Sequence, residues 1–136
     1  MLFNESEIRE IMYQTDPMLM LKLVEKIDDM SVKADINIDN IWSKELAVGT
    51  PIFIVIEAMG QSAEFMWRQS GKTGKALLIG INDLEIEEIR FSFDNVKINA
   101  KANISYRNFC KSNVWITNKS GSKIITAEII HCFFSS

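Results

Sequence analysis

The chain has 136 residues, 47% hydrophobic and 24% charged, which is the composition and length of about one globular domain. Its net charge of −3 argues against a general nucleic-acid binder, because phosphate neutralisation requires clustered Lys and Arg side chains. The longest wholly apolar run, residues 51–56, is far shorter than the roughly 20 residues that span a membrane. The first residues lack the basic and then apolar order of a signal peptide, so we expect a cytosolic (cytoplasmic) protein.

The N-terminal region is predicted to contain a short helix followed by a hairpin. A helix is expected over residues 4–14, because Asn4 is a good N-cap and acidic residues follow it in the first turn. Pro17 ends this helix. Near-alternation of apolar and polar residues then predicts two strands, at 19–28 and 31–38, joined by an Asp-Asp turn.

A long buried helix is predicted over residues 51–69. Residues 40–49 before it have no clear period and are predicted to form a loop. Thr50 and Pro51 fit an N-cap and a first helical position, where proline's missing N–H is harmless. The helix is apolar around most of its circumference, and helices of that kind are buried.

One narrow band of this helix is polar. At about 100° per residue, four polar side chains fall within about 60° of one another: Glu57, Gln61, Glu64 and Arg68. The spacing of Glu64 and Arg68 predicts an ion pair between them. Glu57 has two interpretations, because ionised carboxylates are rarely buried without partners. It is either a core glutamate satisfied by backbone donors or a functional carboxylate.

The second half of the chain is predicted to consist of strands. Five segments are rich in β-branched and aromatic residues: 75–82, 84–93, 96–108, 112–118 and 122–134. Clusters of Asn, Asp, Gly and Ser separate most of them and predict turns. Because the helix must be hidden, the strands are expected to wrap around it as an antiparallel sheet, which gives an α+β fold.

The two cysteines and the single histidine limit the chemistry. Cys110 and Cys132 lack C-x-x-C spacing, so we expect reduced, packed thiols. A single histidine excludes a His-x-x-x-His zinc motif, and we expect neither a metal nor another cofactor. His131 lies in an alternating segment and is interpreted as a structural or edge-strand histidine.

Three segments carry a resemblance to a known family. Residues 51–61, PIFIVIEAMGQ, are similar to the helix signature P-G-V-L-I-x-E-A-M-A-Q of the 3-hydroxyacyl-acyl-carrier-protein dehydratases. Residues 16–24 resemble that family's N-terminal proline and aliphatic strand, and residues 126–132 resemble its last strand. The resemblance covers nearly the whole chain. It implies a single hotdog domain over residues 1–136, with an antiparallel sheet wrapped around a long central helix.

The resemblance also implies a site for an acyl thioester. In the family a histidine and a carboxylate handle the Cα proton and the leaving hydroxyl. Glu57 matches the catalytic carboxylate, and Gln61 matches the glutamine that orients the site. Three residues are candidates for substrate binding: Ser43, at the register of the family's histidine; Ile52, whose N–H at the helix start would polarise the thioester carbonyl; and Phe53, beside the acyl chain.

Because the family's histidine is absent, the chain is similar to the degenerate dehydratase-like subunits of aryl-polyene type clusters, which pair with an active chain. Three functions follow. The first is a dehydratase-like hydro-lyase of fatty acid or related lipid biosynthesis that uses Glu57. The second is a thioesterase in which Glu57 activates water. The third is a non-catalytic acyl-thioester-binding or scaffold subunit.

The resemblance implies two kinds of partner. The substrate would arrive as an acyl carrier protein or coenzyme A thioester, and the subunit partner would form a homodimer or a heterodimer with a related dehydratase. Carrier proteins are acidic, so the basic residues Arg68, Lys72 and Lys75 are a candidate docking cluster, although a solvated turn explains them equally well.

Overall fold

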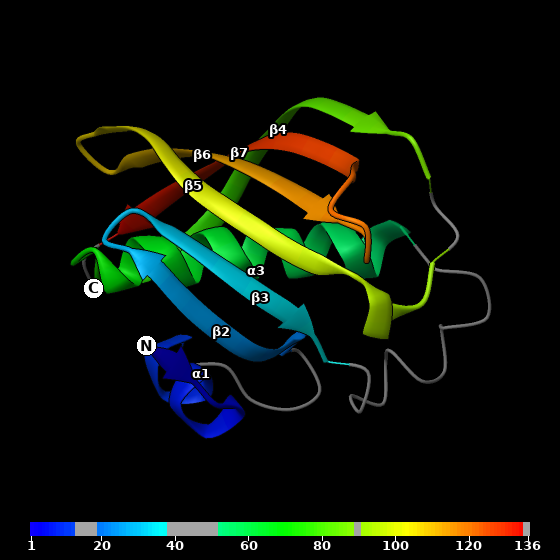
Figure 1. The fold of residues 1–136 in the computed structure, drawn as a ribbon. Helices are drawn as coiled ribbons and strands as arrows, with labels where there is room; N and C mark the ends of the chain where they lie inside the picture. Colours follow the sequence, from blue (N-terminus) through cyan, green and yellow to red (C-terminus); the bar gives the residue numbers. More distant parts are fainter. Residues whose placement is uncertain (13–18, 38–51, 89–90, 135–136) are drawn as a thin grey trace.

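The fold is an antiparallel sheet wrapped around one long helix (Figure 1). The computed structural model describes residues 1–12, 19–37, 52–88 and 91–134. The elements in these ranges are β1 (Leu2–Phe3), α1 (Glu5–Met12), β2 (Leu21–Asp28), β3 (Ser31–Ile36), α3 (Ile52–Gln69), β4 (Lys75–Ile86), η1 (Phe93–Asn95), β5 (Lys97–Tyr106), β6 (Phe109–Thr117) and β7 (Lys123–Phe134). The strands form one sheet in the order β1-β2-β3-β5-β6-β7-β4.

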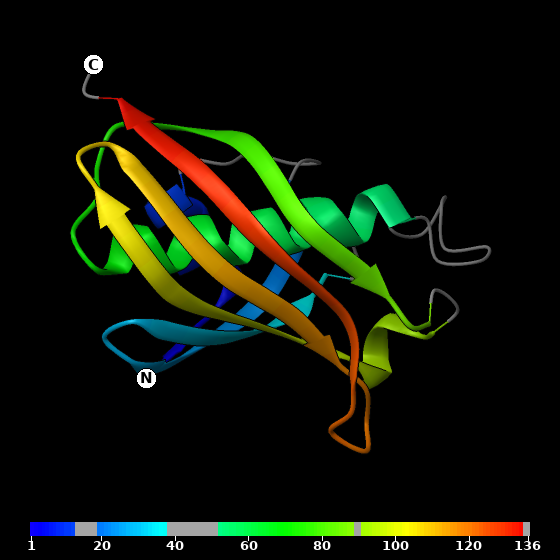
Figure 2. The ribbon, with the colours of Figure 1, turned by 90° about the horizontal axis from the view of Figure 1, so that it is seen from above.

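Helix α3 lies under the sheet and supplies the centre of the core. It contacts strands β2, β3, β5, β6 and β7, and Figure 2 shows the strands crossing it obliquely. The helix buries side chains around most of its circumference, as its apolar composition predicts. Phe65 is fully buried. Its ring packs edge to face against the ring of Phe3, with the two ring centroids 5.1 Å apart. No helix in the described ranges is long and apolar enough to cross a membrane.

A buried hydrogen bond fixes the C-terminal end of α3 against the sheet. Trp67 Nε1 donates to Ser112 Oγ on β6 at 2.7 Å. Ser112 lies on the face of β6 that points to the helix, because Cys110, Ser112, Val114 and Ile116 are buried in alternation along that strand. The indole therefore packs in the core while its N–H is satisfied.

The N-terminal predictions are confirmed where the structure describes them. Asn4 and Glu7 form a reciprocal capping box at the start of α1, with Glu7 N donating to Asn4 Oδ1 at 2.9 Å and Asn4 N donating to Glu7 Oε1 at 3.0 Å. The hairpin β2–β3 turns where predicted, and Asp28 Oδ1 accepts a hydrogen bond from Met30 N at 2.8 Å. This bond lowers the pKa of the exposed Asp28 carboxyl.

Two strand predictions were wrong around Asp83. Segments 75–82 and 84–93 were expected to be separate strands, but β4 is continuous from Lys75 to Ile86. Asp83 has a φ of 53° and lies within an irregularity of the β4–β7 ladder, after which pairing resumes. The residue is thus part of a bulge and not a turn. The chain from 93 to 95 forms a short 3₁₀ helix.

Other boundaries differ by a few residues. β6 begins at Phe109 and not at 112, because the turn after β5 is tight and Arg107 adopts a φ of 56°. β1 was not predicted, since two residues are too short to show a period. The predicted loop 40–49 lies outside the described residues, as do Thr50 and Pro51 at the expected helix start.

A matched pair of substitutions on α3 tests this packing. We expect Phe65→Ala to lower the free energy of unfolding by about 3–5 kcal/mol, because it opens a cavity under β1. Phe53→Ala on the same helix should cost less than about 0.5 kcal/mol, because Phe53 is 57% exposed. Urea unfolding followed by tryptophan fluorescence measures both; equal losses would contradict the described packing.

Candidate active site

The centre of the candidate site is a hydrogen-bonded pair on α3. Gln61 Nε2 donates to Glu57 Oε1 at 3.1 Å, one helical turn away. Gln61 is buried, and its Oε1 accepts the backbone N–H of Met20 at 2.8 Å. Because the carbonyl end of the amide is held by Met20, the amino end is directed at Glu57. Glu57 is half-buried and meets this donor as a hydrogen-bond acceptor.

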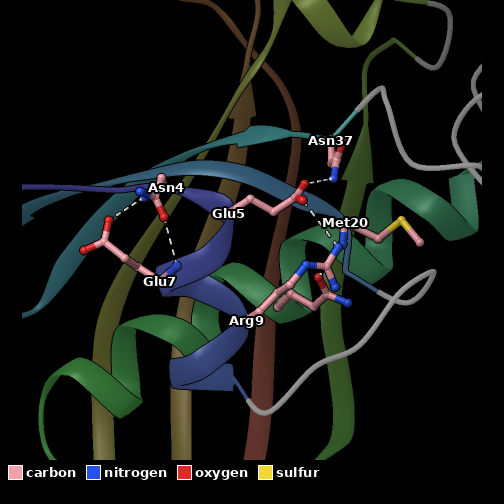
Figure 3. Close-up of polar contacts among 7 residues, drawn as sticks. Asn4, Glu5, Glu7, Arg9, Met20 and Asn37 are labelled. Atoms are coloured by element: carbon pink, nitrogen blue, oxygen red, sulfur yellow. Dashed lines mark hydrogen bonds and ion pairs between the residues drawn. The ribbon is translucent and has the colours of Figure 1, made fainter.

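A further layer of hydrogen bonds holds the backbone of Met20 through its carbonyl. Met20 O accepts the backbone N–H of Asn37 at 2.8 Å, one position beyond the β2–β3 ladder. The side chain of Asn37 is buried, and its Nδ2 donates to Glu5 Oε1 at 2.6 Å. Figure 3 shows Glu5 and Arg9 of α1 converging on this point. These residues could not be predicted from the sequence, since no local pattern joins positions this far apart.

The second half of the polar band is an ion pair, as predicted. Arg68 Nε donates to Glu64 Oε2 at 2.8 Å, and the two side chains are 6% and 12% exposed, respectively. Burial raises the pKa of the Glu64 carboxyl, and the negative charge of Glu57 adds to this effect, while Arg68 opposes it. The guanidinium of Arg68 also lies 5.4 Å from the centre of the Phe133 ring.

This ion pair corrects the expectation of a basic docking cluster. Arg68 is buried against Glu64 and Phe133, so it does not present a free cation to a carrier protein. Lys72 Nζ donates to the carbonyl of Arg107 at 3.1 Å. Arg68, Lys72 and Lys75 therefore do not form one exposed basic surface.

The three candidate substrate-binding residues are placed differently. Ile52 begins α3 and packs partly against the core, so its N–H belongs to the first turn, where amides lack intrahelical partners. Phe53 is exposed and is not a core residue. Ser43 lies outside the described residues.

His131 is a buried histidine in the interior of the sheet. Strand β7 lies between β6 and β4, so His131 is not on an edge strand. Among the described residues, no hydrogen-bond partner reaches its Nδ1. Burial, followed by the nearby charge of Arg68, lowers its pKa from 6.5 to about 4. The imidazole is therefore neutral at pH 7, and no described contact joins it to Glu57.

Several solved structures share this architecture, whereas the sequence matches no protein-family model and no curated protein. The dehydratase heterocomplex ApeI:P from Xenorhabdus doucetiae has a TM-score of 0.77 at 17% identity, over 95% of this chain and 91% of that chain. A hypothetical thioesterase with coenzyme A from Streptococcus pneumoniae has a TM-score of 0.67 at 12% identity, over 95% and 98%. A thioesterase from Haemophilus influenzae has a TM-score of 0.70 at 10% identity, over 96% and 90%.

The chain has the hotdog fold. The identities of 10–17% establish the hotdog architecture and not an activity. The similar structures include both dehydratase and thioesterase proteins.

The buried His131 predicts a pH-dependent contribution to stability. Its pKa is lowered to about 4 in the folded chain, so between pH 6.5 and 4 the unfolded chain binds more protons. This contribution is fully present above pH 6.5 and is lost as the pH falls through that window, by about 1.4 kcal/mol per pH unit at most. We expect His131→Leu to remove this component.

The measurement is the free energy of urea unfolding of both proteins at several pH values between 4 and 7. Carboxyl groups contribute equally to the pH dependence of unfolding in the two proteins. The difference between the two slopes of unfolding free energy against pH therefore isolates the contribution of His131. Parallel curves would show that His131 is accessible to protons in the folded protein.

Proposed function

We propose that this hotdog protein binds acyl thioesters and uses Glu57 as a general base in a dehydratase-like reaction on 3-hydroxyacyl groups. The observation that supports this most is the Met20–Gln61–Glu57 chain, because it orients a half-buried carboxylate beside the start of a buried helix. Helix starts favour negative charge, so this is a suitable place for a thioester carbonyl that becomes an enolate. The proposed setting is cytoplasmic lipid biosynthesis.

In this proposal one carboxylate moves the proton twice. The N–H of Ile52 polarises the thioester carbonyl, which makes the Cα proton more acidic. Glu57 removes that proton, and the electron pair is stored in the enolate. When the enolate collapses, the Cβ–O bond breaks, and the protonated Glu57 returns its proton to the departing hydroxyl. The products are a 2-enoyl thioester and water. Ser43 and Phe53 are proposed to contact the substrate.

Thioester hydrolysis is the second candidate, and it is favoured by the same single carboxylate. Hydrolysis needs one base to activate water and one donor for the oxyanion, and Glu57 and the N–H of Ile52 could supply both.

A third candidate is a non-catalytic acyl-thioester-binding or scaffold subunit. The products separate these functions, because hydration removes the enoyl absorbance, hydrolysis releases a free thiol, and a scaffold does neither.

The key test follows the ultraviolet absorbance of a 2-enoyl thioester, carried on coenzyme A and then on acyl carrier protein. The wild-type protein should hydrate the double bond. We expect Glu57→Gln to lower the rate by about 100-fold or more, since it keeps the hydrogen bond but removes the base. Thiol release is measured in the same samples with a thiol reagent.

Glu128→Gln is the matched control. Glu128 lies 3.5 Å from Lys111 and accepts from Asn82 on the outer side of β7, so its loss should leave the rate unchanged. If both variants keep wild-type rates, Glu57 is not the base. If the wild type releases thiol without hydration, the reaction is hydrolysis.

We also propose that strand β4 pairs with a second hotdog subunit. β4 lies at the edge of the sheet and exposes large apolar side chains: Leu77, Leu78, Ile79, Leu84 and Ile86. An uncovered edge strand of this kind is a template for pairing with another chain. Leu78 also adjoins Gly60, the residue before Gln61, so a subunit at this edge would lie beside the site. An antiparallel β4–β4 pair would be symmetric, which favours a homodimer.

Ile79→Lys tests this interface, because a lysine in the middle of the edge strand opposes pairing. The wild type should sediment as a dimer and the variant as a monomer. Ile27→Lys is the control, since Ile27 is 53% exposed on β2 and Ile79 is 50% exposed on β4. A monomeric wild type would contradict the homodimer and direct the search to a heterodimer with a related dehydratase.

A further inference from the structure

The first helix is connected to the candidate base through an unbroken path of hydrogen bonds. The path begins at the α1 carboxylate of Glu5, passes through the Asn37 side chain to its backbone N–H, and reaches the Met20 carbonyl, which is linked to the Met20 N–H through the Cα atom. The Met20 N–H then holds Gln61, and Gln61 holds Glu57. The path joins α1, the end of β3, the residue before β2, and α3.

Two side chains on this path are polar and buried, so each depends on the particular partner that the path gives it. Asn37 and Gln61 are each 3% exposed, so water cannot readily replace a lost partner. Asn37 engages Met20 with its main chain and Glu5 with its side chain. The Met20 C=O that Asn37 holds and the Met20 N–H that Gln61 holds flank the same Cα atom, so a displacement of Asn37 moves the Met20 backbone and with it the acceptor end of the Gln61 amide.

The bond from Asn37 to Glu5 is the strongest link by its chemistry. Its Nδ2···Oε1 distance is 2.6 Å, and its acceptor is a carboxylate, which strengthens a hydrogen bond. Glu5 is held in turn by Arg9, whose Nη2 lies 3.5 Å from the other carboxylate oxygen. Glu5 is also in the first turn of α1, where the helix dipole favours an acid.

We propose that Asn37 and Glu5 are positioning residues for Glu57. This inference rests on the proposed role of Glu57 and extends it to two residues that touch no reacting atom. Through the backbone of Met20, whose C=O and N–H lie on either side of one Cα atom, they set the direction of the Gln61 amide, and the amide sets the orientation of the Glu57 carboxylate. Their effect should appear in kcat and not in KM, because catalysis requires an orientation that binding alone does not.

The experiment exchanges the donor and the acceptor between positions 5 and 37. Asn37→Asp places two carboxylates against each other and should lower kcat by about 10-fold to 100-fold, with KM within about threefold. Glu5→Gln alone keeps an acceptor oxygen at position 5, so its kcat should stay close to that of the wild type. In the double variant the amide at position 5 donates to the carboxylate at position 37, so kcat should recover.

Asn4→Ala is the matched control for the stability of α1. It removes the capping box on the same helix turn and should lower the unfolding midpoint, yet it leaves the bond between Glu5 and Asn37 in place. Its kcat should therefore equal that of the wild type. An equal loss of kcat in Asn4→Ala and Asn37→Asp would overturn the proposal, as would a double variant that does not recover.

Hydrogen exchange without substrate separates this inference from the proposed function. The Met20 amide should exchange faster in Asn37→Asp, return to its wild-type rate in the double variant, and stay slow in Asn4→Ala. The NMR signals of the Gln61 side-chain amide should shift in Asn37→Asp, return to their wild-type positions in the double variant, and stay unchanged in Asn4→Ala. If these signals behave so while the protein hydrates no enoyl thioester, the positioning path stands and the proposed reaction fails. Unchanged Met20 exchange would overturn the path itself.

Discussion

The site depends on how a buried glutamine amide is satisfied. An amide has one acceptor and one donor end, and Gln61 gives its acceptor end to the Met20 N–H and its donor end to Glu57. Reversing it would set its amino group against the Met20 N–H and its carbonyl against a carboxylate, leaving buried polar groups unpaired. The Met20 N–H therefore favours the orientation in which the amino group of Gln61 faces Glu57.

The hotdog architecture places this constraint where a ligand could use it. The sheet covers α3 from β2 round to β7, and the apolar circumference of the helix is buried under it. The polar band that holds Glu57 and Gln61 continues to the ion pair of Glu64 and Arg68. Because Glu64 is paired with Arg68 in this buried part of the band, Glu57 is the carboxylate to which we assign the substrate in the proposed function.

The parts of the fold that sequence predicted well are those with local causes. The apolar circumference predicted α3, and the i, i+4 spacing predicted the ion pair of Glu64 and Arg68. The sequence was divided into two strands around Asp83, whereas pairing with β7 continues past this residue through a bulge that only the partner strand reveals. The hotdog resemblance was confirmed by the solved structures, whereas the narrower dehydratase-like assignment remains a proposal.

The second layer of the site could not be predicted, for a physical reason. The bond from Met20 to Gln61 spans 41 positions, and the bond from Asn37 to Glu5 spans 32. Neither leaves a periodic signal, because each depends on how the first helix, the hairpin and α3 come together in three dimensions. Asn4 could be recognised as a cap from its own neighbours, but Glu5 beside it could not be recognised as a partner of Asn37.

The most direct test of the account is an NMR titration of the wild-type protein with an acyl-pantetheine analogue in which a methylene replaces the thioester sulfur. We expect the NMR signals of the Gln61 side-chain amide and of the backbone amides at the start of α3 to shift together and to saturate with one affinity. Saturable shifts confined to the outer face of the sheet, or no shifts at millimolar analogue, would contradict an acyl site at Glu57.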